Sequence, residues 1–137
     1  MRSRSALILL AVLYLSATAA LADCRQHNLG DRVVLYGTAD DPDVFVWDSR
    51  FRMRSYQGGS FDQAQALLPH ALLAPPGTRA AVADCVGNFV QSKYASIPDD
   101  AVGVVIVAGP LKGKSGWVIG ADIRRAIERE RTSPLRR

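Results

Sequence analysis

Short apolar runs, each broken by glycine, proline or aspartate, recur along the middle of the chain. Arg32 to Tyr36 is a β-branched run between turn-forming residues, and Asp43 to Asp48 alternates valine with phenylalanine and tryptophan. Both patterns are typical of β-strands that are bounded by turns. The stretch from Arg79 to Val90 is of the same kind, and it predicts either a pair of strands or one bent strand.

One segment between these strands has the pattern of a helix. Two glycines end the strand pattern, and Ser60 with Gln63 three residues later has the spacing of a capping box. The apolar positions that then fall on one helical face are Phe61, Ala64 and Leu68. Proline lacks the N–H that a helix interior needs, so Pro69 ends the predicted helix after about two turns.

The most apolar part of the body runs from Val102 to Ala108. Both faces of this predicted strand are apolar, which is typical of a strand buried in the middle of a sheet. A glycine and a proline then predict a turn, and Trp117 to Ile119 predicts the returning strand. Ala121 to Arg131 predicts a terminal helical turn or a short helix. Short strands with glycine and proline between them favour a small barrel over a parallel sheet.

The first 22 residues differ from the rest of the chain. A short basic start leads into an almost unbroken apolar run from Ala6 to Leu15, and residues 20–22 form an Ala-Leu-Ala cleavage site. This pattern is typical of a secretory signal peptide. A retained N-terminal anchor is the alternative, and the cleavage site argues against it. We therefore predict an exported protein, periplasmic or secreted, with a signal peptide at residues 1–22 and no membrane anchor after cleavage.

Net charge narrows the classes of partner. The 137 residues include 17 Lys+Arg and 13 Asp+Glu, a formal net charge of +4. The segment from Arg124 onward is rich in arginine, whereas the body from Asp23 to Ile123 has more acidic than basic residues. A nucleic-acid-binding face needs cations clustered on the folded body, so we expect no nucleic-acid partner. The length predicts one domain at residues 23–131 and a flexible basic tail at residues 132–137.

Two cysteines follow the predicted cleavage site. Cys24 and Cys85 are separated by 61 residues, and an exported protein meets an oxidising environment. This pair predicts one structural disulfide. A nucleophilic or metal-binding cysteine is the alternative, but it needs a histidine or a second cysteine close to it in the sequence.

The segment around the last two predicted strands resembles a known family. Residues 109–118, with the sequence GPLKGKSGWV, follow a valine-rich strand and resemble the closing hairpin of bacterial SH3-like domains. Pro75 to Arg79, before another β run, is similar to the entry into that family's second strand. The resemblance spans Asp31 to Ile123 and implies a mainly β fold, a small SH3-like barrel. The long segment before Pro75 is then an insertion with the second strand and the helix, and a C-terminal helical turn follows the barrel.

Titratable residues give little support to catalysis. His27 and His70 are the two histidines, and no G-x-S-x-G or Ser-x-x-Lys arrangement accompanies them. The aspartates at 40, 41, 43, 99 and 100 have the pattern of turn formers rather than of a calcium loop. The glycines and lysines between Gly109 and Gly116 lack the order of a phosphate-binding loop. We therefore expect no enzyme activity, metal or cofactor.

Aromatic residues are the better candidates for binding. Tyr36, Trp47 and Trp117 lie at or near strand ends, where an SH3-like barrel presents its peptide-binding surface. Lys112 and Lys114, at the tip of the predicted hairpin, are further ligand-binding candidates toward an anionic polymer. The alternatives are that Trp117 fills the barrel and that Trp47 is buried beneath the insertion.

These observations together predict a function at the cell envelope. We expect a monomeric, exported, non-catalytic SH3-like binding module that recognises peptide, peptidoglycan or a partner protein. A small secreted inhibitor or accessory subunit of an envelope enzyme is the first alternative. A small hydrolase is the second.

Overall fold

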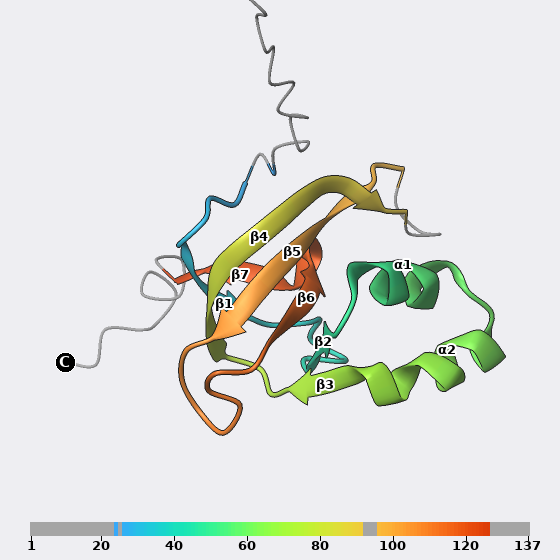
Figure 1. The fold of residues 1–137 in the computed structure, drawn as a ribbon, viewed down its shortest axis with the longest axis horizontal. Coiled ribbons are helices and arrows are strands. Elements are labelled where there is room, and N and C mark those ends of the chain that lie inside the picture. The colour runs from blue at the N-terminus through green and yellow to red at the C-terminus, as the bar shows by residue number, and fades with distance from the viewer. Residues whose placement is uncertain (1–23, 25, 92–95, 127–137) are drawn as a thin grey trace, which may run out of the picture.

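Seven antiparallel strands form one curled sheet in the computed structural model, which describes residues 24, 26–91 and 96–126 (Figure 1). The strands are β1 (Arg32–Leu35), β2 (Val44–Trp47), β3 (Ala71–Ala74), β4 (Thr78–Val90), β5 (Asp99–Ile106), β6 (Ser115–Ile119) and β7 (Ile123–Arg125). Their order in the sheet is β3-β2-β6-β5-β4-β1-β7, so β3 and β7 lie at its two edges. The mainly β fold is confirmed, as a half-barrel. The predicted signal peptide and basic tail lie outside the described residues.

The segment between β2 and β3 holds two helices that pack beside one end of the sheet (Figure 1). They are α1 (Arg50–Gly58) and α2 (Phe61–Leu67), and a 3₁₀ turn, η1 (Leu68–His70), follows them. The predicted capping box of α2 is present: the Ser60 hydroxyl accepts a hydrogen bond from the Gln63 N–H, and the Gln63 side chain accepts one from the Ser60 N–H. The predicted helical insertion is therefore confirmed.

The sequence predicted either a pair of strands or one bent strand from Arg79 to Val90, and the structure has one bent strand, β4. It is one long strand that pairs with β1 through its first four residues, Thr78 to Ala81, and with β5 along most of its length. The pairing register shifts between Val82 and Asp84 and again between Val86 and Val90. Such irregularities bend a strand and increase its twist, so β4 can curl around the half-barrel.

Alternation along the strands divides the core into two clusters. On β2, Val44 and Val46 point into the cluster inside the curl, whereas Phe45 and Trp47 point to the opposite face beneath α1. On β6, Val118 lies in the first cluster and Trp117 packs against the second. This is the period-two pattern expected of strands with both faces covered.

The chain after β6 agrees with the sequence-based prediction in part. A 3₁₀ turn, η2 (Gly120–Asp122), supplies the expected helical turn, but Ile123–Arg125 then forms β7 instead of helix. Residues 127–131 of the predicted segment lie outside the described residues. β7 pairs with the free side of β1, and Ile123 is buried in the core cluster inside the curl. Edge pairing and burial of Ile123 thus outweigh the helical propensity of this short segment.

The predicted disulfide is confirmed. Cys24 and Cys85 are bonded, and their Cα atoms lie 5.8 Å apart, a usual separation for such a bond. The bond attaches the segment before β1 to the second half of β4. The two sulfur atoms lie near a carboxylate oxygen of Asp100, but sulfurs already bonded to each other supply no thiolate ligands for a metal ion.

Candidate functional site

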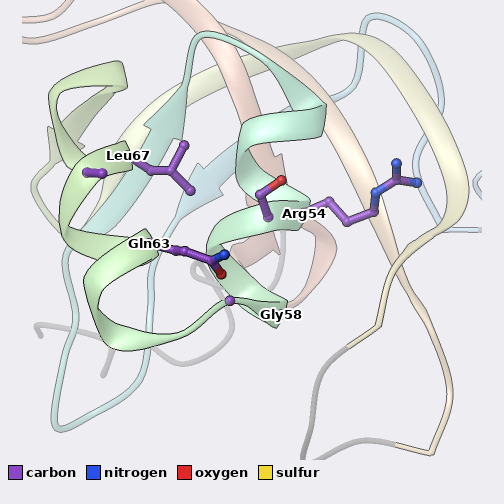
Figure 2. Close-up of a pocket in the computed structure, with 7 residues that line it drawn as sticks. Arg54, Gly58, Gln63 and Leu67 are labelled. Carbon is purple, nitrogen blue, oxygen red and sulfur yellow. The ribbon is translucent and has the colours of Figure 1, made fainter.

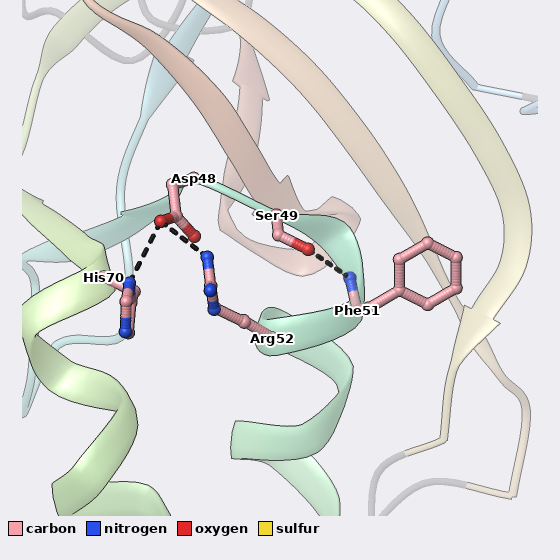
Figure 3. Close-up of polar contacts among 5 residues, drawn as sticks. All are labelled: Asp48, Ser49, Phe51, Arg52 and His70. Carbon is pink, nitrogen blue, oxygen red and sulfur yellow. Dashed lines mark hydrogen bonds and ion pairs between the residues drawn. The ribbon is translucent and has the colours of Figure 1, made fainter.

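The first turn of α1 begins directly after β2. Ser49 is the N-cap residue, and its hydroxyl accepts a hydrogen bond from the Phe51 N–H at 3.2 Å (Figure 3). Met53, one turn later, is the buried residue of the helix. Because this side of α1 faces the sheet, the neighbouring positions Arg50, Phe51 and Arg54 reach toward β4 and β6.

Trp47 lies beneath α1. Its side chain is 2% exposed, and its ring centroid is 4.9 Å from that of Tyr56 on α1. The expectation of an exposed Trp47 is therefore corrected to the alternative, burial beneath the insertion. The physical reason is that Trp47 alternates to the sheet face that the insertion covers.

The structure does not bring the other predicted aromatic residues into one groove. Tyr36 is 38% exposed at the end of β1, whereas Trp47 and Trp117 face each other across β2 and β6. Two strands, β5 and β4, separate β6 from β1 in the sheet. Lys112 and Lys114 are exposed at the tip of the β5–β6 hairpin, where the positive φ angles of Gly109 and Gly113 form the turn.

Arg50, Phe51 and Arg54 of α1 gather with Phe89 of β4 and Trp117 of β6, and we call these five residues the arginine–aromatic cluster. The Arg50 guanidinium carbon lies 5.2 Å from the Phe51 ring centroid, 5.6 Å from that of Phe89 and 5.4 Å from that of Trp117. The Arg54 guanidinium carbon lies 5.3 Å from Phe51 and 4.5 Å from Phe89. These are distances at which cations are attracted to aromatic faces.

Within the described part of the chain, the two cations of this cluster have no carboxylate partner. Neither Arg50 nor Arg54 takes part in an ion pair, and Nε of Arg50 is buried without a hydrogen-bond partner. Phe51 is 53% exposed and meets Phe89 edge to face, with centroids 5.5 Å apart. The cluster therefore presents Arg54 and the Phe51 ring at the surface, with the half-buried Arg50 beside them.

Arg52 differs from its two neighbouring arginines. Its guanidinium donates a 2.8 Å hydrogen bond to Asp48, and His70 Nδ1 lies 3.1 Å from the same carboxylate oxygen (Figure 3). Desolvation raises the pKa of Asp48, but hydrogen bonds from Arg52 and His70 and the charges of both outweigh it, so the pKa lies below its ordinary value. These contacts tie the start of α1 to η1.

An open depression of about 590 Å³ lies between α1 and α2 (Figure 2). The Arg54 side chain extends away from it, toward Phe89. The Gln63 side-chain oxygen at its edge is occupied by the capping box. Because Arg54 points toward Phe89 and Gln63 serves the capping box, we assign no catalytic or binding role to this depression.

Asp122, at the end of η2, is a second perturbed carboxyl. Burial raises its pKa to about 6, the nearby Arg124 opposes this change, and the charges of Asp99 and Asp41 add to it. Asp99 meanwhile accepts hydrogen bonds from the backbone N–H groups of Asp100 and Ala121. The raised pKa of Asp122 affects the stability of the fold, and Asp122 is not part of the arginine–aromatic cluster.

Sequence reasoning missed four of the five residues in the cluster. The available signal was local: Arg50 and Arg54 are four residues apart in a segment with three arginines and no acidic residue. That spacing places both on one helical face. Their approach to Phe89, 35 residues beyond Arg54, depends on how α1 packs on the end of β4 and has no sequence signature.

The comparisons with known proteins found no match for this chain among family models, curated proteins or solved structures. Among the described residues, no helix has the length and apolar character needed to span a membrane.

Proposed function

We propose that this protein is an exported, non-catalytic binding module of the cell envelope, with an SH3-like barrel, that recognises peptide, peptidoglycan or a partner protein. The observation that carries the proposal is the arginine–aromatic cluster. Arginine and aromatic side chains dominate the energetics of many binding surfaces, because they combine contact area with directed hydrogen bonds. An exported location, periplasmic or secreted, is compatible with the Cys24–Cys85 disulfide.

The fold holds the residues of the cluster in fixed positions relative to one another. Its five residues come from one helix and two strands, so the sheet and α1 fix their relative positions. A ligand that contacts the exposed Phe51 ring meets the two guanidinium groups beside it. Such preorganisation lowers the entropy that is lost when a ligand binds.

Pelleting with purified peptidoglycan sacculi tests this function directly. We expect the wild-type protein to sediment with sacculi, and Phe51→Ala combined with Arg54→Gln to lower the bound fraction about fivefold or more. Arg52→Gln is the matched control, because Arg52 lies on the same helix but contacts Asp48. Thermal melts of all variants establish that the fold is retained. Equal sedimentation of the double variant and the control would remove the cluster from the proposed function.

The contact between His70 and Asp48 favours a small hydrolase as a second candidate. A histidine oriented by a carboxylate is the geometry of a general base. The hydroxyl of Ser49 nearby serves instead as the helix cap. Turnover of ester, amide or glycan substrates that is lost in His70→Ala, with the fold intact, would establish this candidate in place of the binding module.

A further inference from the structure

We infer that the ligand of the arginine–aromatic cluster is an acidic peptide, with carboxylates that bind Arg50 and Arg54 and an apolar side chain that packs on Phe51. This inference rests on the proposed function, because it names the class of ligand for the same site.

The first support is that no carboxylate among the described residues pairs with the positive charges of Arg50 and Arg54. Both guanidinium groups contact the ring of Phe89, with Arg50 at 5.6 Å and Arg54 at 4.5 Å from its centroid. The two positive charges are thus no farther apart than about a Debye length, ~10 Å at 0.1 M salt, and repel each other. An anion between them converts this repulsion into two attractions.

The second support is the way in which the rings hold the cations. The guanidinium carbon of Arg50 lies over the rings of Phe51, Phe89 and Trp117, and the N–H groups along the guanidinium edge are the donors that bind anions. Carboxylates fit this edge through two parallel hydrogen bonds. Among the described residues, Nε of Arg50 is buried and has no hydrogen-bond partner, so the carboxylate binds the terminal N–H groups of this guanidinium.

The third support is the apolar ring beside the cations. Phe51 is 53% exposed although Phe89 and both arginines contact it. A ligand with an apolar side chain next to its carboxylate covers this surface and removes water from the ion pairs. Removing water strengthens these electrostatic interactions.

An anionic membrane fits the cluster less well than a peptide does. Recognition of anionic lipid surfaces uses clusters of about four to eight basic residues. The cluster has two arginines, and the neighbouring Arg52 is paired with Asp48. A short acidic segment needs no more than these two cations and one ring.

The test measures binding of acetyl-Glu-Phe-Glu-amide to the disulfide-bonded chain, with acetyl-Gln-Phe-Gln-amide as the neutral probe. We expect the acidic probe to bind about fivefold or more tightly than the neutral one, and raising salt from about 20 to about 300 mM to weaken it. We expect the Arg50 and Arg54 side-chain N–H signals in NMR spectra to shift on titration. Arg54→Gln should weaken binding about fivefold or more, Arg54→Lys less, and Arg52→Gln less than twofold.

Several outcomes overturn the inference. Equal affinity for the two probes excludes carboxylate recognition, and equal effects of Arg54→Gln and Arg52→Gln exclude the cluster as its site. Binding to phosphatidylglycerol vesicles that is lost in Arg54→Gln, without binding of the acidic probe, assigns the cluster to a membrane surface instead. Sedimentation with sacculi that needs Arg54, again without probe binding, overturns the ligand class and leaves the binding function standing. Because Arg54 is exposed, its variants keep the test independent of folding.

Discussion

Single side chains in this fold divide sharply between packing and surface roles, and the aromatic residues show it best. Trp47 is 2% exposed between the sheet and α1, whereas Tyr36 is 38% exposed at the end of β1. Truncating a buried aromatic residue costs about 3–5 kcal/mol, because it removes contacts and leaves a cavity. We therefore expect Trp47→Ala to lower the free energy of unfolding by about this amount in urea titrations. Tyr36→Ala should cost less than about 1 kcal/mol, and an equal loss in both variants would contradict the assigned burial.

Asp122 makes the stability of the protein depend on pH. Its pKa is about 6 in the fold against 3.8 for the ordinary group, so the folded protein holds this proton more strongly than the unfolded chain does. Its contribution to stability is fully present below about pH 3.8 and is lost as pH rises through about 6. We expect Asp122→Asn to raise the melting temperature by about 2–5 °C at pH 7.5 and by little at pH 4. Asp40→Asn, at an exposed position, is the control, and a gain for Asp122→Asn that is the same at both pH values would contradict this origin.

At the scale of elements, the five strands β1, β2, β4, β5 and β6 were predictable, and β3, β7 and α1 were not. Alternation of valine with aromatic residues on β2 and the apolar run of β5 are local patterns, and each carries its own signal. The segment of α1 is rich in arginine and buries Met53 alone, so it has almost no apolar stripe to indicate a helix. β3 is a four-residue edge strand whose pairing with β2 depends on where the two helices return the chain. The arginine–aromatic cluster could not be predicted for the same reason, because it forms where α1 meets β4.

The cap of α1 gives an element-scale prediction. Ser49 satisfies the Phe51 N–H, and the first turn of α1 has no acidic residue that would favour the positive end of the helix. We expect Ser49→Ala to cost about 1 kcal/mol of stability. It should also weaken ligand binding, because Arg50 and Phe51 lie in that first turn. Ser49→Asp retains a cap and is the matched control, so chemical denaturation that ranks Ser49→Asp below Ser49→Ala would contradict the capping role.

At the scale of the whole molecule, strand pairing and a disulfide between segments far apart in the sequence hold the half-barrel together. β1 joins β7 to β4, and the Cys24–Cys85 disulfide ties the segment before β1 to the same long strand. Cysteine spacing and an exported pattern predicted this bond, because two thiols in an oxidising compartment leave one possible pairing. The curl of the sheet had no comparable signal, since it arises from the register shifts of β4.

The disulfide closes a loop of 61 residues, and its contribution should appear in the unfolded state. The chain-entropy model gives roughly 4 kcal/mol for a loop of this size, because the bond restricts the unfolded chain more than the folded one. We expect Cys24→Ala combined with Cys85→Ala to lower the free energy of unfolding by about 2–4 kcal/mol while the folded β-sheet spectrum is retained. Thiol titration of the unfolded, unreduced wild-type protein should find no free thiol among the two cysteines. Free thiols in that titration would contradict the bond, and an unchanged denaturation midpoint in the double variant would show that the tether to β4 leaves stability unaltered.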